Sequence, residues 1–295
     1  MTAEKQKWLL LIALSLIWGS SFILIKKSLD HFNPYEVGAL RVLISGIVLM
    51  PFALSKIKLF PKRHLKWLII VGLSGSFVPM FLFPMAETEI SSSIAGIINS
   101  MMPIFVIIVG SLVWKFSTTK RQLLGVLISF TGACILALGS GESGEIKIYP
   151  ILLLLLATLL YAISTTTVKS KLHDVPAILM SAYVFSIVLF LPSLVALVFS
   201  GFFSHFSFTK DNFVGLGFVV MLSIFGTGLA MMMNYKLLSI STPLFASTVT
   251  LLMPIVAIIW GILDGEELTA MQSVGALIIL AGLIFLRSKP KIANG

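Results

Sequence analysis

The residues best suited to hydrogen-bond a small polar ligand recur at corresponding places along the chain. A Met-Met-Pro motif ending at Pro103 corresponds to a Leu-Met-Pro motif ending at Pro254, 151 residues later. A proline inside a helix frees the carbonyl group four residues earlier, which here belongs to Asn99 and to Thr250. We therefore predict two kinked helices lining a central cavity, with Asn99 and Thr250 offering hydrogen bonds. The alternative is that both kinks serve helix packing alone.

Arg41 is the residue whose burial in a membrane costs the most free energy, because it lies about seven positions into an apolar stretch. A charge in hydrocarbon costs at least about 2.5 kcal/mol, so a lipid-facing position is disfavoured. Its guanidinium could bind a carboxylate or phosphate group. It could instead pair with Glu87 or Glu89, either as an outer gate or as a structural ion pair.

Trp18 and Tyr161 correspond between two similar segments, "WGSSFILIKKSLDHFNP" and "YAISTTTVKSKLHDVP". A buried aromatic ring with a polar edge needs a partner or a wet cavity. We predict that both rings line the cavity, with plain helix packing as the alternative. Ser20 and Asn234 are further candidates for the cavity wall.

Ten apolar stretches must position these side chains. The chain of 295 residues is 58% hydrophobic and 11% charged, whereas a typical globular domain carries about 25% charged residues. Such a chain cannot cover a water-facing surface, and a membrane-spanning helix needs roughly 20 apolar residues. The stretches are 8–28, 34–55, 65–85, 90–114, 121–139, 148–169, 176–200, 213–238, 242–263 and 269–287.

The distribution of charge gives the expected topology. With the N-terminus in the cytoplasm and ten crossings, most of the 21 Lys and Arg residues fall in cytoplasmic segments, as the positive-inside rule requires. The net charge of +9 thus reflects membrane orientation and does not indicate nucleic-acid binding. Lys26 and Lys27 break the rule; they either snorkel outward or line an outer vestibule, and Lys169 is their repeat counterpart.

The second half of the chain repeats the first. The segment "QLLGVLISFTGACILAL" is answered by "QSVGALIILAGLIFL", so that Gly125 and Gly132 match Gly275 and Gly282. A glycine-rich segment, 139–145, separates the halves. We predict two five-helix domains, 8–139 and 148–287. Because five is odd, the domains insert with opposite orientation, which is the inverted-topology repeat common in secondary transporters.

Three local patterns carry a family resemblance: "LIWGSSFILIKKSL", "EVGALRVLISGIVLMP" and "GEELTAMQSVGALIILAGLIFL". The chain resembles the EamA-type group of the drug/metabolite transporter superfamily over nearly its whole length. The resemblance implies a transporter of small metabolites, often directed outward. The acidic pair Glu266 and Glu267 has no counterpart in the first half, so that feature is not duplicated.

No pattern for catalysis or cofactor binding is found. The four histidines lie in predicted loops, Cys134 is the single cysteine, and no Walker motif or HExxH sequence is present. We expect no catalytic residue, no metal and no cofactor.

The sequence therefore predicts an all-α integral membrane protein of ten transmembrane helices in two inverted repeats, with both termini cytoplasmic. We expect a secondary transporter of the bacterial or archaeal plasma membrane and not an enzyme. Export of amino acids or related metabolites follows from the resemblance. The alternatives are a nucleotide-sugar or sugar-phosphate exchanger, a lipid flippase, or an intramembrane enzyme. The expected partners are a small-molecule substrate and the lipid bilayer, and no oligomeric state is predicted.

Overall fold

The computed structural model describes residues 2–90, 92–138, 148–263 and 269–286, and every regular element within these ranges is a helix. The first half of the chain forms α1 (Ala3–Leu29), α2 (Pro34–Ser55), η1 (Ile57–Leu59), η2 (Lys62–His64), α3 (Leu65–Gly72), η3 (Leu73–Phe77), α4 (Val78–Glu87), α5 (Ser92–Asn99), α6 (Met102–Trp114) and α7 (Lys120–Leu138).

The second half forms α8 (Ile148–Lys171), α9 (Ala177–Tyr183), η4 (Val184–Val188), α10 (Phe190–Phe199), α11 (Phe202–His205), α12 (Lys210–Ser223), η5 (Ile224–Leu229), α13 (Ala230–Ile240), α14 (Pro243–Ser247), α15 (Val249–Leu263) and α16 (Ala270–Leu286). The elements η3, η4 and η5 are π-helical turns that join the helices on either side of them.

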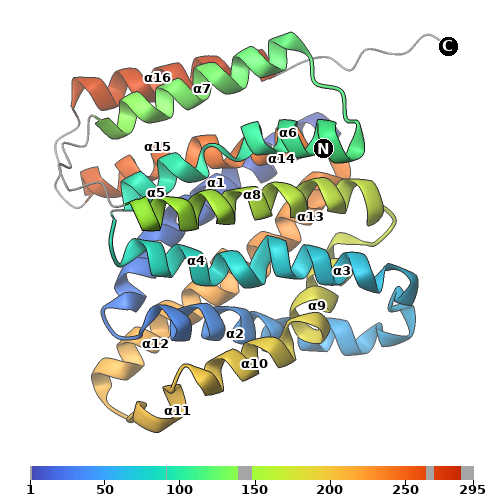
Figure 1. Ribbon diagram of the computed structural model, residues 1–295, viewed down its shortest axis with the longest axis vertical. Coiled ribbons are helices and arrows are strands. Elements are labelled where there is room, and N and C mark those ends of the chain that lie inside the picture. The colour runs from blue at the N-terminus through green and yellow to red at the C-terminus, as the bar shows by residue number, and fades with distance from the viewer. Residues whose placement is uncertain (1, 91, 139–147, 264–268, 287–295) are drawn as a thin grey trace.

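The helices form one bundle in which most axes are roughly parallel or antiparallel, while α1, α12 and α13 cross the others obliquely (Figure 1). The pair α7 and α16 lies along one edge of the bundle, and α2, α10 and α12 lie toward the opposite edge. The start of α1 and the end of α16 are at the same end of the bundle, which we call the N-terminal end.

Each of the ten predicted stretches is largely helical where the structure describes it, with short breaks inside some of them. Within those residues, six helical stretches are long and apolar enough to cross a membrane. A seventh consists of Ala177–Val188 and Phe190–Phe199, bent by 43°. The remaining apolar helices are shorter, so the count of ten crossings and the cytoplasmic termini stay predictions.

The outer surface of the bundle is apolar, as a lipid environment requires. Large side chains such as Leu112 and Phe199 are 78% and 86% exposed, while the polar side chains of Ser45, Ser129 and Thr227 are fully buried. This inverts the usual arrangement of a water-soluble protein, in which large apolar patches are rarely exposed.

The start of α2 is fixed by its own sequence. The Asn33 side chain accepts hydrogen bonds from the amides of Tyr35 and Glu36, and the Glu36 carboxylate accepts one from the Asn33 amide. Pro34 occupies the first turn, where its missing N–H leaves no broken bond. This capping box sets the register of α2 and hence the depth of Arg41.

The two halves pack as related units. Helix α7 lies against its counterpart α16, and the Ser129 hydroxyl donates a 3.0 Å hydrogen bond to the carbonyl of Ile279. A Cβ on Gly132 would come within 2.7 Å of the Ile279 nitrogen, so only glycine permits this approach. Likewise α1 packs on α15, as α8 packs on α6. The segment 139–145 and the pair Glu266 and Glu267 lie outside the described residues.

Candidate functional site

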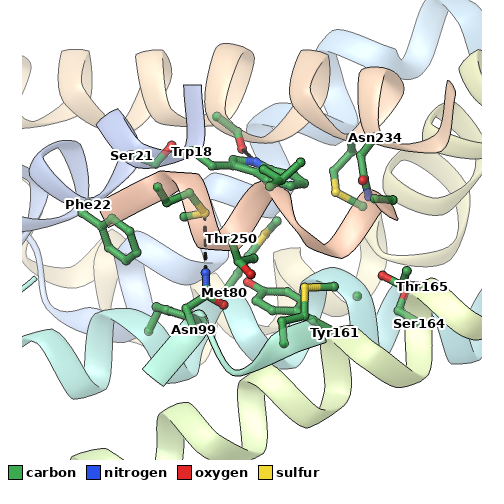
Figure 2. A pocket seen from close by; sticks show the side chains of 18 of the residues that line it. Trp18, Ser21, Phe22, Met80, Asn99, Tyr161, Ser164, Thr165, Asn234 and Thr250 are labelled. Carbon is green, nitrogen blue, oxygen red and sulfur yellow. Dashed lines mark hydrogen bonds between the residues drawn. The ribbon is translucent and has the colours of Figure 1, made fainter. Parts of the chain in front are cut away.

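A cavity of about 90 Å³ lies between the two halves, near the middle of the bundle. Its wall is largely aromatic and sulfur-containing, from Trp18, Phe22, Phe83, Tyr161, Met80, Met102, Met231 and Met253. Its polar members are Ser21, Arg41, Asn99, Ser164, Thr165, Asn234 and Thr250. Figure 2 shows Trp18 and Tyr161 on opposite sides of the cavity, with Thr250 between them, Asn99 on the same side as Tyr161, and Asn234 farther along. An apolar wall with a few polar groups is typical of a small-molecule site.

The structure thus brings together most of the predicted site residues, with one exception. Trp18, Arg41, Asn99, Tyr161, Asn234 and Thr250 all contribute to the cavity wall. Ser20 does not: its hydroxyl donates to the carbonyl of Leu16 and accepts a 2.6 Å hydrogen bond from Trp260 on α15. The neighbouring Ser21 takes the cavity position, because a helix turns by about 100° per residue.

The two predicted proline kinks take the form of helix breaks that precede the prolines. The first lies between Asn99, the last residue of α5, and Met102, the first of α6, so Pro103 occupies the first turn of a new helix. The second break, at Thr248, precedes α15, and Pro254 lies inside that helix. A proline is accommodated most readily in a first turn, which explains why the break forms ahead of Pro103.

The freed carbonyl of Thr250 has a partner from the other half of the chain. Ser100 donates to it a hydrogen bond of 2.9 Å. The Thr250 hydroxyl donates to the carbonyl of Ser247 at 2.9 Å. Asn99 is less well satisfied: its amide nitrogen lies 3.6 Å from the sulfur of Met253, and its buried oxygen Oδ1 has no hydrogen-bond partner. A buried acceptor without a partner costs about 1–3 kcal/mol.

Arg41 is 6% exposed and lies on the cavity wall. Its Nε donates a 2.7 Å hydrogen bond to the hydroxyl of Thr227 in the π-helical turn η5. Over the described parts of the chain, no ion pair joins Arg41 to Glu87 or Glu89 within 4 Å. The Glu87 carboxylate instead accepts a 3.0 Å hydrogen bond from Ser92. The outer gate involving these residues therefore stays a prediction.

The sequence analysis missed a matched pair of contacts at the π-helical turns. Gly75 in η3 and Gly226 in η5 both line the cavity and are 151 residues apart. A Cβ on Gly75 would come 2.1 Å from the hydroxyl oxygen of Ser164, and one on Gly226 would come 2.7 Å from that of Ser21. The offset is the one shared by the two prolines, so it could have identified both glycines.

Trp18 is held by the same turn. Its indole nitrogen donates a 3.0 Å hydrogen bond to the carbonyl of Gly226. The ring of Tyr161 stacks on Phe83 with 5.9 Å between centroids, and its hydroxyl has no hydrogen-bond partner in the described ranges. π-Helical turns often occur at functional sites, and here they place backbone groups against the cavity.

Comparison with known proteins shows which family the chain belongs to. The model of the EamA-like transporter family matches residues 6–138 and 148–288. An uncharacterized transporter of Archaeoglobus fulgidus is 27% identical, over 96% of this chain and 99% of its own length. A probable amino-acid metabolite efflux pump of Salmonella typhimurium is 27% identical, over 95% of this chain and 94% of its own. The uncharacterized inner membrane transporter YedA of Escherichia coli is 25% identical, over 94% of this chain and 89% of its own.

A solved crystal structure shares the fold, with a TM-score of 0.72 and 14% identity over 96% of both chains. The family model covers both halves of the bundle that surround the cavity. The chain therefore belongs to the EamA-like transporter family and is a multi-pass transporter of the plasma membrane.

Proposed function

We propose that the protein is a secondary transporter that exports small zwitterionic metabolites, in particular amino acids. The observation that carries the proposal is that, in the part of the chain the structure describes, one cavity contains both a guanidinium without an ion-pair partner and a buried amide oxygen without a hydrogen-bond donor. The Arg41 guanidinium has no carboxylate within 4 Å among the described residues, and the Asn99 oxygen Oδ1 is a buried acceptor without a donor. A ligand with a carboxylate and an ammonium group complements both.

The remaining wall suits the apolar part of such a ligand. Aromatic rings supply flat contact surfaces, and methionine side chains adapt to different shapes. At about 90 Å³ the cavity is smaller than the engineered void of about 150 Å³ that admits benzene. The cavity must therefore widen before it can admit any but the smallest amino acids. Flexible methionine side chains in its wall would allow this widening.

Transport by alternating access follows from the inverted repeats. We infer that the domains 8–139 and 148–287 insert with opposite orientation, both termini being cytoplasmic. Rearrangement of one half against the other then exposes the cavity to each side in turn. The outward direction rests on the name of the Salmonella typhimurium relative. The cavity has one charged side chain, Arg41, among its lining residues, which disfavours the heavily charged nucleotide sugars.

Thermal unfolding of the purified protein tests the proposed ligand class. The panel is a set of α-amino acids, the matching amines without the carboxylate, and the matching carboxylic acids without the amine. A ligand that binds the folded state raises its stability by about 2.7 kcal/mol at 100 times its Kd. We expect stabilisation by amino acids only, its loss in Arg41→Ala, and its retention in the control Lys26→Ala, because Lys26 is exposed.

Amino acids that stabilise the wild type and Arg41→Ala equally would show that the arginine is structural. Stabilisation by the amines alone would refute the zwitterion proposal. Counterflow of the best ligand in proteoliposomes then tests transport itself.

A further inference from the structure

A second cavity, of about 250 Å³, lies at the N-terminal end of the bundle and takes no part in the proposed transport site. It is bounded by α6, the segment that leads into α7, the end of α8 and the start of α14. The residues that matter to its chemistry are Val106, Ile107, Ser117, Thr118, Lys169 and Leu244. None of them lines the central cavity.

One wall of this cavity is formed where the chain reverses after α6. Lys115 adopts a left-handed conformation with φ 54°, and the amide of Phe116 donates a 2.9 Å hydrogen bond to the carbonyl of Gly110. The Phe116 ring lies against Gly110, where a Cβ would come within 3.2 Å of it. The reversal folds the next residues back along α6, and this places Ser117 and Thr118 beside Val106 and Ile107.

The opposite wall carries a cation that has no counter-ion in the described parts of the chain. The Lys169 Nζ donates hydrogen bonds of 3.0 Å to the carbonyl of Leu238 and 2.7 Å to that of Ser241, at the end of α13. An ammonium group has three donors, so one remains. A partly buried cation without an anion is unfavourable at membrane depth, and an anionic ligand in the cavity would neutralise it.

The cavity is amphipathic. Val106, Ile107 and Leu244 form an apolar side, and Lys169 with the two hydroxyls forms a polar side. The hydroxyls of Ser117 and Thr118 make no hydrogen bond to any described residue and are free to donate to an anion.

The surroundings of the cavity place it close to the membrane–water interface. Trp67 and Trp114 pack with 6.0 Å between ring centroids, and Lys171 lies 5.5 Å and 5.4 Å from the two rings. Tryptophans that carry basic neighbours mark the membrane–water interface. Trp114 ends α6, the helix that lines the cavity two turns deeper with Ile107. Basic pockets between helices at this level bind anionic lipid headgroups.

We propose that this cavity binds the phosphate headgroup of an anionic phospholipid, with Lys169 and the hydroxyls of Ser117 and Thr118 contacting the phosphate and the α6 side chains contacting the lipid chain. The lipid lies against the two halves where they meet, since α6 belongs to the first and α8 and α14 to the second. A soluble phosphate ester carries the same anion but lacks the apolar part that the other wall accommodates.

Native mass spectrometry of the full-length protein in detergent tests this proposal. The probes are phosphatidylglycerol, phosphatidylcholine with the same acyl chains, and glycerol 3-phosphate. We expect phosphatidylglycerol to bind, phosphatidylcholine to bind at least about tenfold more weakly, and glycerol 3-phosphate not to compete, because loss of a charge-assisted contact costs roughly 1.5–3 kcal/mol.

Two variants and one control locate the site. Lys169→Gln removes the charge, and Thr118→Trp fills the cavity without altering α13. We expect each variant to lower phosphatidylglycerol binding about tenfold, since each removes a contact to the same headgroup. The control is Lys26→Gln, the repeat counterpart of Lys169, which is exposed. Thr118→Trp keeps the test decisive if Lys169→Gln unfolds.

Unchanged lipid binding in Thr118→Trp, or equal binding of the two lipids, would overturn the proposal. Competition by glycerol 3-phosphate would assign the cavity to a soluble anion instead and would also overturn it. The readout is lipid binding, so the result does not depend on whether the central cavity transports amino acids.

Discussion

Three pairs of residues at equivalent positions in the two halves differ in their bonding: one member of each pair is satisfied within the protein, while the other keeps a polar group without a partner among the described residues, and two of the pairs line the central cavity. Asn99 keeps an unpartnered oxygen, whereas Thr250 is bonded to Ser247. Trp18 is bonded to Gly226, whereas the Tyr161 hydroxyl has no hydrogen-bond partner in the described ranges.

The third pair consists of Arg41 and Tyr183, each seven residues after the proline at the start of its stretch. Tyr183 is fully buried and donates a 2.7 Å hydrogen bond to the carbonyl of Lys56, while Arg41 bonds Thr227 through Nε alone. The two halves thus place equivalent residues at equivalent positions. The bonded members hold the helices together, and the polar groups of the others remain available to a ligand.

The largest expected effect is at the glycines of the π-helical turns. Gly75→Ala would place its Cβ 2.8 Å from the Cβ of Ser164, whereas Gly226→Ala would meet the ends of two side chains, the hydroxyl oxygen of Ser21 at 2.7 Å and Cδ1 of Leu222 at 3.1 Å. We expect both variants to lose most amino-acid counterflow in proteoliposomes, because overpacking costs about 1–3 kcal/mol and shifts the backbone.

The rescues separate the two glycines. Ser21→Ala should restore Gly226→Ala, because it removes the closest atom and the remaining close contact, at 3.1 Å, is with the flexible end of the Leu222 side chain. Gly75→Ala should need Ser164→Gly, and Ser164→Ala should fail. Equal rescue by Ser21→Ala and Ser164→Ala would contradict these contact distances and would show that the two glycines are packed alike.

The next largest effect is expected at Asn99. Asn99→Ala removes the unpartnered acceptor, so we expect the Kd of the best amino acid, measured by calorimetry, to rise about tenfold, the equivalent of one hydrogen bond to a charged group. Thr250→Val should change the Kd by less than about threefold, since that hydroxyl already bonds Ser247. A larger effect at Thr250 than at Asn99 would reverse the assignment of these two residues.

A smaller effect is expected at Trp18 and Tyr161. Substitution of Trp18 should lower stability, whereas substitution of Tyr161 should lower ligand affinity. Trp18→Phe leaves the Gly226 carbonyl without its indole donor and should lower the free energy of unfolding by about 1–2 kcal/mol. Tyr161→Phe removes a hydroxyl that has no partner among the described residues, so stability should not change while amino-acid affinity falls a few-fold. Denaturation and calorimetry on the same two variants measure both quantities. Loss of stability in Tyr161→Phe would show that its hydroxyl has a structural role.

The helices and the α7–α16 contact could be predicted from the sequence, because the length of an apolar stretch and the spacing of repeated glycines can be read directly from the chain. The match of Gly125 and Gly132 to Gly275 and Gly282 corresponds to the α7–α16 contact. The choice between Ser20 and Ser21 could not be predicted, because it depends on the rotation of α1 against α15. The π-helical turns are also invisible to hydrophobic periodicity, since they insert a residue without changing composition.

The smallest effect is expected at the two ends of the bundle, each of which has a His–Asp contact between the halves. At the N-terminal end, His64 lies 3.0 Å from Asp174, which also accepts a hydrogen bond from Arg63. At the opposite end, His31 lies 3.1 Å from Asp211 and carries a charge only when protonated. The hydrogen bond from His64, together with that from Arg63, holds the pKa of the Asp174 carboxyl below its ordinary value, although burial acts in the opposite direction.

Because the folded state binds the Asp174 proton less tightly than the unfolded chain does, this carboxylate stabilises the fold above its ordinary pKa. That contribution is lost as the pH falls through the lowered value. Asp174→Asn should therefore lower the melting temperature slightly at pH 7, by the equivalent of less than about 1 kcal/mol because the pair is largely exposed. The difference from wild type should shrink below about pH 4. Asp211→Asn is the matched control and should cost less at pH 8, because no arginine pairs with Asp211 among the described residues as Arg63 does with Asp174. Equal costs at pH 8 would mean that Arg63 adds nothing and that the two ends are held alike.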